Sequence, residues 1–137
     1  MRNAVIGEAS VGDATEIVER LIAFNSEQAE PENVAHVALS LKTHDGRLIG
    51  GVTAARSWKT LIIDVLWVDE IERGKGYGEQ LLAAVEQRGV ELGCNQAALE
   101  TFSFQATRFY VSNGYTTVGE VMGWPPSGKL SRMVKPL

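Results

Sequence analysis

The feature that most constrains this chain is an apolar segment that leads through a glycine-rich loop into an amphipathic helix. Residues 61–68 form the most apolar stretch and predict a central strand covered on both faces. The loop follows as Arg73-Gly74-Lys75-Gly76-Tyr77-Gly78. In the predicted helix, which runs to Leu92, one face carries Leu81, Leu82, Val85, Gly89 and Leu92, and the other carries Glu79, Glu86, Gln87 and Glu91. This order of strand, loop and helix predicts an α/β fold.

Segments on both sides of this unit complete the predicted order. A helix is expected over residues 13–27, capped by Asp13 with Glu16 three residues on, and a further strand is expected before it. A short helix is expected over residues 105–112. Strands are expected over residues 34–42, 48–55, 61–68, 96–101, 115–121 and 129–134. Since no linker or repeat interrupts the 137 residues, we expect a single domain over residues 1–137, with a mixed, mostly antiparallel central sheet flanked by helices.

The glycine loop has the properties of an anion-binding site. Three glycines within five residues let the backbone adopt positive φ and let a ligand approach closely. The first N–H groups of a helix lack intrahelical acceptors, which suits a diphosphate. Arg73 and Lys75 add positive charge. Two other phosphate loops do not match, because Glu79 stands where the dinucleotide fingerprint requires glycine, and Gly76 stands where the P-loop requires Ser or Thr.

Composition disfavours several classes of protein. The net charge is −4, from 13 Lys and Arg against 17 Asp and Glu, which counts against sequence-independent binding of nucleic acid. No stretch approaches the roughly 20 apolar residues of a membrane helix, so no membrane partner is expected. The single cysteine, Cys94, cannot form an internal disulfide and fits a cytoplasmic location. His36 and His44 lack the spacing of metal ligands, so no metal is expected.

Two blocks of the sequence, in register, resemble the GCN5-related N-acetyltransferase (GNAT) family. The glycine loop matches the family's Arg/Gln-x-x-Gly-x-Gly/Ala, which lies between its fourth strand and third helix. Residues 106–115, Ala-Thr-Arg-Phe-Tyr-Val-Ser-Asn-Gly-Tyr, match the family's Ala-x-x-hydrophobic-Tyr-x-x-x-Gly-Phe/Tyr. The resemblance is strong over residues 61–120 and compatible elsewhere. It departs at Ser103, where many members have an Asn that contacts the cofactor; a serine can still donate a hydrogen bond, with shorter reach.

The resemblance implies a site for acetyl-CoA as co-substrate. Backbone groups of Leu66, Trp67 and Val68 would pair with the pantetheine arm as if it were an added strand. The amides of residues 73–78 would hold the diphosphate. In the family the fourth and fifth strands splay apart, so the resemblance predicts a gap between residues 66–68 and residues 99–101.

The implied reaction moves an acetyl group to a primary amine by direct transfer in a ternary complex. Tyr110 stands where the family often uses a tyrosine to protonate the leaving thiolate, although its ring could instead pack on the core. A backbone N–H near Trp67 or Val68 is expected to stabilise the oxyanion. Glu100 and Asp64 are candidate bases, since a carboxylate in an apolar central strand is costly unless it serves a site. Either could instead bind only the charge of the amine, and water as the base stays open.

The sequence leaves the acceptor unidentified. We expect a small-molecule or peptide amine, and Trp124 could line its pocket, pack at a subunit contact or cap the core. A homodimer is expected, because dimers are common in the family and the chain is short. Two alternatives stay open. One is a non-catalytic acyl-CoA-binding regulatory module on the same fold, and the other is an acetyltransferase acting on nucleic acid, which the acidic composition disfavours.

Overall fold

The structure, a computed structural model, describes residues 3–137, which divide into two compact units. The first unit ends at Glu32 and the second is Asn33–Leu137. Each unit is described separately below.

The first unit contains one long helix, α1 (Val11–Gln28). Ser10 caps it: the Ser10 hydroxyl accepts a hydrogen bond from the Asp13 backbone N–H at 3.0 Å, and the Asp13 carboxylate accepts one from the Ser10 N–H. The prediction that Asp13 is the cap was therefore wrong, because Asp13 is the third residue of the helix and closes the capping box. The strand expected before this helix is also absent from the described residues 3–10.

The second unit is built on a sheet of six strands in the order β1-β2-β3-β4-β6-β5. β3 and β4 are parallel, and the other neighbouring strands are antiparallel, which confirms the predicted mixed sheet. The strands are β1 (Ala35–Lys42), β2 (Leu48–Ser57), β3 (Thr60–Val68), β4 (Gln96–Phe102), β5 (Thr116–Met122) and β6 (Lys129–Pro136). The helices are the short 3₁₀ helix η1 (Glu70–Glu72), α2 (Tyr77–Glu91) and α3 (Thr107–Ser112).

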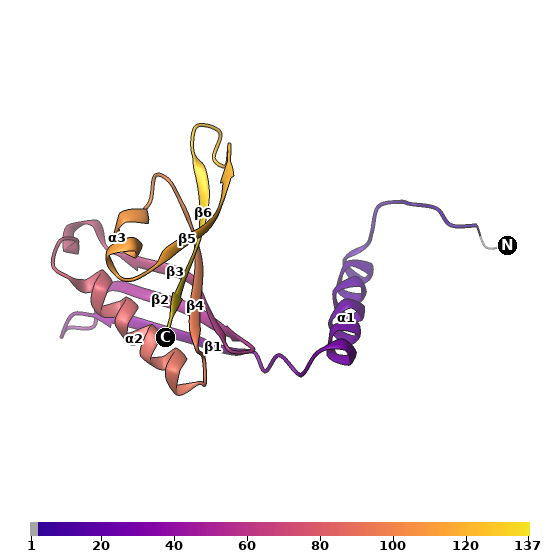
Figure 1. The fold of residues 1–137 in the computed structure, drawn as a ribbon, viewed down its shortest axis with the longest axis horizontal. Coiled ribbons are helices and arrows are strands. Elements are labelled where there is room, and N and C mark those ends of the chain that lie inside the picture. The colour runs from indigo at the N-terminus through magenta and orange to yellow at the C-terminus, as the bar shows by residue number, and fades with distance from the viewer. Residues whose placement is uncertain (1–2) are drawn as a thin grey trace. The chain divides into compact units, whose positions relative to one another are not determined.

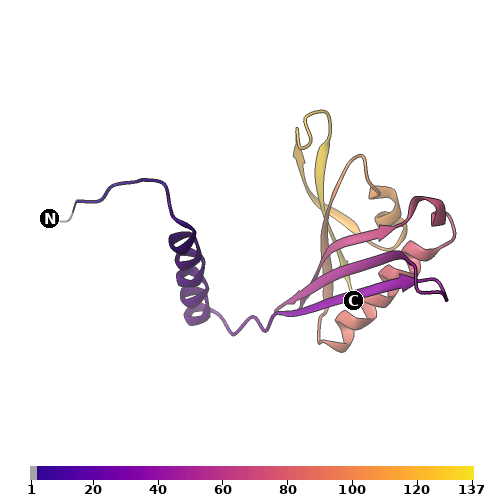
Figure 2. The same ribbon diagram turned by 180° about the vertical axis from the view of Figure 1, so that it is seen from behind.

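Helix α2 covers one face of the sheet formed by β1, β2 and β3, as the two opposite views in Figures 1 and 2 show. Its predicted apolar face is confirmed, since Leu81, Leu82, Val85 and Gly89 are buried. Gly89 permits the closest approach: a Cβ at this position would lie 2.9 Å from Leu61 Cδ2 on β3. The glycine therefore sets the distance between the helix and the central strand.

Glu86 differs from its predicted place on the outward face of α2, since only 12% of its side chain is exposed. The Tyr115 hydroxyl donates a hydrogen bond to it at 2.7 Å, and Lys135 Nζ on β6 donates another at 2.9 Å. Burial and the bond to Glu86 raise the pKa of Tyr115, so the phenol stays protonated. Glu86, Tyr115 and Lys135 thus link α2 to the start of β5 and to β6. The hydrophobic periodicity of the helix could not indicate these partners of Glu86, because they lie 29 and 49 residues further along the chain.

Replacing Gly89 by valine is expected to destabilise the protein by about 1–3 kcal/mol, because the added side chain overlaps Leu61. Chemical denaturation in urea measures the change. Gln87→Val is the matched control, since it places the same β-branched residue at an exposed position of the same helix. Equal stability of the two variants would contradict the close approach.

Candidate active site

The site begins where two parallel strands separate. β3 and β4 pair only through Thr60, Leu61 and Ile62, opposite Gln96, Ala97 and Ala98. Beyond Ile62, β3 stays paired with β2 as far as Val68, while β4 stays paired with β6 as far as Phe102. Each strand thus follows its outer neighbour, and two inner edges are left without a strand partner.

A bulge on β3 lies exactly at this separation. In the pairing with β2, Thr53 is opposite Val65 and Ala54 is opposite Ile63, so Asp64 is an extra residue. A bulge bends its strand and increases the local twist. Asp64 follows Ile62 by two residues, and the bend therefore takes β3 away from β4 just after their last pair. The predicted gap between residues 66–68 and residues 99–101 is confirmed.

The gap forms a hollow of about 560 Å³, which we call the slot. Its lining comes from both strands and from the connection into α3: Asp64, Val65, Leu66, Trp67, Val68, Arg73, Glu100, Thr101, Phe104, Gln105, Ala106 and Tyr110. Phe104, Gln105 and Ala106 were not expected here from the sequence, although Ala106 opens the second family-like block.

A second hollow of about 480 Å³, the loop hollow, lies along the glycine loop. It shares Leu66, Val68, Arg73, Ala106 and Tyr110 with the slot, so the two hollows adjoin. Gly74 and Gly76 have φ of 79° and 83°, as the loop prediction requires, and open space lies where a Cβ would project from either residue. Gly76 caps α2 with no side-chain hydrogen bond, which leaves the first N–H groups of the helix available to a ligand.

The third glycine of the loop has a different role. A Cβ at Gly78 would lie 3.4 Å from the ring of Phe109, so the start of α2 packs closely against α3 at this point. This contact places the glycine loop beside the helix that carries Tyr110.

The basic side chains of the loop are held by neighbouring groups. Arg73 Nε donates a hydrogen bond to the Val68 carbonyl at 3.0 Å, and Lys75 Nζ lies 2.7 Å from Glu72 Oε2. Glu72 also pairs with Arg47. The hydrogen bond with Lys75 lowers the pKa of Glu72 and raises the pKa of Lys75, so both remain charged at neutral pH. Glu72 therefore offsets the charge of Lys75, whereas the carbonyl bound to Arg73 is neutral and leaves the charge of Arg73 in place.

Tyr110 lines both the slot and the loop hollow. It lies on α3, is 9% exposed and contacts Phe109 and Tyr115 edge to face. Burial raises the pKa of the Tyr110 phenol, so it is protonated at neutral pH and able to donate a hydrogen bond. The ring thus packs on the core while the residue also borders the slot, and its role at the thiolate stays a prediction.

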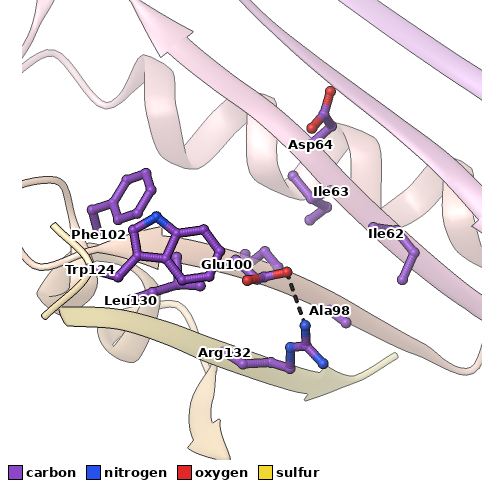
Figure 3. Close-up of a pocket in the computed structure, with 10 residues that line it drawn as sticks. Ile62, Ile63, Asp64, Ala98, Glu100, Phe102, Trp124, Leu130 and Arg132 are labelled. Carbon is purple, nitrogen blue, oxygen red and sulfur yellow. Dashed lines mark hydrogen bonds and ion pairs between the residues drawn. The ribbon is translucent and has the colours of Figure 1, made fainter. Parts of the chain in front are cut away.

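The two candidate carboxylates differ in their surroundings. Asp64 is exposed, which contradicts the expectation of a buried carboxylate, because it lies on the same side of β3 as the exposed Ile62, while Leu61 and Ile63 point into the core. No hydrogen bond or ion pair involves Asp64 within residues 3–137. Glu100 lies 3.1 Å from Arg132 Nη2. Figure 3 shows the Glu100–Arg132 pair between β4 and β6, with Asp64 apart from it on β3.

Ser103 lies at a different contact from the one predicted. Its hydroxyl accepts a hydrogen bond from the Lys129 backbone N–H at 3.1 Å, and its own N–H donates to the Lys129 carbonyl at 2.9 Å. Ser103 lines neither the slot nor the loop hollow. Cofactor contact by this serine stays a prediction, and the bond to Lys129 counts against it.

A third hollow of about 540 Å³, the Trp124 hollow, adjoins the slot through Asp64 and Glu100 (Figure 3). It is also lined by Phe102, Trp124, Leu130 and Arg132. The three hollows therefore succeed one another from the glycine loop, through the gap between the strands, to Trp124. Within residues 3–137, no three His, Cys, Asp or Glu side chains gather as a metal site would require.

Comparison with known proteins gives the same family as the sequence motifs. The model of the acetyltransferase (GNAT) family matches residues 8–115. A blasticidin-S acetyltransferase of Streptomyces morookaense is 39% identical over 93 residues, which cover 67% of this chain and 68% of the relative. The crystal structure of an acetyltransferase from Bacillus cereus is 34% identical and covers 98% of both chains, with a TM-score of 0.94.

A proposed streptothricin acetyltransferase from Bacillus anthracis, solved in complex with acetyl coenzyme A, shares the fold. Its TM-score is 0.67 at 21% identity, covering 82% of this chain and 67% of that one. The chain described here belongs to the acetyltransferase (GNAT) family, and it is an acetyltransferase that uses acetyl-CoA.

Replacing Gly76 by valine is expected to weaken binding of CoA at least about tenfold, because a β-branched side chain opposes the positive φ and projects into the loop hollow. Isothermal titration calorimetry with CoA measures the affinity. Gly46→Val is the matched control: Gly46 also has a positive φ, 90°, and open space at its Cβ, but it lies in the β1–β2 turn. Equal losses in the two variants would show that backbone strain alone, and not the loop, causes the effect.

Proposed function

We propose that this protein transfers an acetyl group from acetyl-CoA directly to a small-molecule primary amine, with both substrates bound together. The observation that carries the proposal is the unbroken series of hollows from the glycine loop to the carboxylates. Acetyl-CoA would enter along the glycine loop and the amine from the Trp124 hollow, and the two would meet between β3 and β4.

The residues along this series fit the coenzyme. The N–H groups of residues 73–78 would hold the diphosphate, and the unpaired inner edge of β3 at Leu66, Trp67 and Val68 would pair with the pantetheine arm. Arg73 would stay bound to the Val68 carbonyl and keep the loop against the end of β3. Bound acetyl-CoA supplies an activated acetyl thioester in the slot.

Tyr110 would act on the leaving sulfur. A phenol with an ordinary pKa near 10 is a weaker acid than a thiol with a pKa near 8.5, and burial of Tyr110 widens that difference. Full proton transfer would therefore be unfavourable, whereas donation of a hydrogen bond to the developing negative charge would remain favourable. A backbone N–H near Trp67 or Val68 would donate to the acetyl oxygen in the same way.

The amine must lose its proton before it can attack. For an alkylamine with a pKa of about 10.4, deprotonation at neutral pH costs roughly 4–5 kcal/mol. Asp64 and Glu100 both line the slot and could accept the proton directly or through water. Asp64 is the stronger candidate, since Arg132 already offsets the charge of Glu100.

The relatives support a small-molecule acceptor. One related chain is named a blasticidin-S acetyltransferase, and a protein of the same fold is described as a streptothricin acetyltransferase. The test is a panel of amines that includes both antibiotics and a short peptide, with free CoA thiol and acetylated product measured together. Turnover on a small molecule supports the proposal, and saturable binding of CoA without turnover on any amine would refute it.

We further propose that residues 1–137 act as one cytoplasmic domain and form a homodimer. The family match spans residues 8–115 and so includes parts of both compact units. Within the described residues no helix is long and apolar enough to cross a membrane. The dimer is supported by the small size of the chain, since small domains bury little apolar surface on their own. The mass in solution, measured by light scattering, would be that of a monomer if the dimer proposal is wrong.

Tyr110→Phe is expected to lower kcat about tenfold to a hundredfold while leaving the affinity for CoA nearly unchanged, because only the hydroxyl is lost. Steady-state kinetics and calorimetry measure the two quantities. Tyr115→Phe is the matched control, since its hydroxyl bonds Glu86 away from the slot. Full activity of the Tyr110 variant would show that water or another group serves the thiolate.

The variants Asp64→Asn and Glu100→Gln are expected to show which carboxylate accepts the proton of the amine and which only binds the positive charge of the amine. Loss of the base should lower kcat/KM most at low pH, where the amine is most fully protonated, and so change the acid side of the pH–rate profile. Loss of a charge-binding group should raise KM without changing the shape of that profile. If neither variant alters the profile, water is the base and both assignments are wrong.

A further inference from the structure

The Trp124 hollow carries a feature that amine acetylation by itself does not require. Trp124 and Phe102 lie together at one end of the hollow, as Figure 3 shows, with ring centroids 6.3 Å apart and planes inclined by 56°. Phe104, which lines the slot, stacks on Phe102 at 5.5 Å with nearly parallel planes. The three rings therefore form a continuous aromatic wall from the Trp124 hollow into the slot.

This wall is exposed although it is large and apolar. Trp124 is 53% exposed and Phe104 is 71% exposed. Exposed apolar surface beside polar groups marks a place where a ligand binds. Here the rings adjoin Asp64 and Glu100, which line the same hollow.

The position of Trp124 is fixed by its turn. Gly123 N–H donates to the Gly128 carbonyl at 2.9 Å, and Gly128 N–H donates to the Pro125 carbonyl at the same distance. Ser103 braces the end of this turn through its bond to Lys129, and a Cβ on Gly128 would overlap the Ser103 hydroxyl. These bonds hold the backbone of the turn, and a tryptophan on a held backbone has only two side-chain torsions to order when a ligand binds.

We propose that the acceptor is an amine that carries a flat aromatic or heteroaromatic ring, with the ring against Trp124 and the ammonium directed toward Asp64 and Glu100. This inference rests on the proposed amine acetylation and adds the chemical class of the acceptor. The indole supplies a stacking surface that favours a flat π system over a puckered ring of the same size. Asp64 supplies a negative charge that no neighbouring cation offsets in the described chain.

The test compares 2-phenylethylamine with 2-cyclohexylethylamine, which share the same amine and chain length. The cyclohexyl ring is the more apolar of the two, so preference for the phenyl compound reports stacking rather than burial of apolar surface. We expect KM for 2-phenylethylamine to be about fivefold lower. Binding of both amines in the presence of CoA is measured by calorimetry as well, so that the comparison does not depend on turnover.

Trp124→Leu keeps an apolar side chain and removes the indole. It is expected to raise KM and Kd for 2-phenylethylamine about fivefold and to raise those for 2-cyclohexylethylamine less, since only the phenyl ring loses a stacking partner. Trp58→Leu is the control, because Trp58 lies in the turn between β2 and β3 and lines none of the three hollows.

The outcomes separate this inference from the proposed function. Ring-dependent binding that Trp124→Leu abolishes supports the inference even if neither amine is acetylated, in which case the proposed acetyl transfer to these amines fails instead. Acetylation of both amines with equal KM in the parent protein and in Trp124→Leu overturns the inference and leaves the proposed function standing. Failure of both amines to bind also overturns it.

Discussion

The separation of β3 from β4 after three residue pairs is the constraint on which the rest of this molecule depends. Each strand keeps its outer neighbour, so the cost of lost pairing is confined to two inner edges. An unpaired edge presents N–H and C=O groups that require a partner, and an extended ligand can supply it. The bulge at Asp64 fixes where the separation begins, and it also sets the one unpaired carboxylate of the slot at that point.

The two ends of the site use different physical means. At the glycine loop Glu72 offsets the charge of Lys75, and Arg73 donates to a backbone carbonyl, so recognition there would depend mainly on backbone N–H groups held by positive φ. At the other end, recognition would depend on side chains from β3, β4 and the β5–β6 turn, which meet only in the folded sheet. The backbone-built end suits the shared coenzyme, while the end built from side chains can vary with the acceptor.

The sequence was most informative where a pattern is local. The glycine loop, the apolar face of α2 and the block from Ala106 to Tyr115 each gave correct elements, because neighbouring residues decide them. Predictions that depended on distant partners were less successful. Glu86 was expected to face solvent, and it binds Tyr115 and Lys135; Asp64 was expected to be buried, and it lies on the exposed side of β3. Ser103 bonds Lys129, and its contact with the cofactor stays a prediction.

By itself, the sequence determined the α/β order, the family and the conformation of the glycine loop, since each depends on contiguous residues with a fixed spacing. Only the tertiary structure decided which carboxylate is paired, how far β3 and β4 remain together, and that Trp124, Phe102 and Phe104 form one aromatic wall beside Asp64. These features join residues up to 60 positions apart in the chain. No local sequence pattern predicts that these residues lie together, because their proximity depends on the strand register and on the turn that places β6 between β4 and β5.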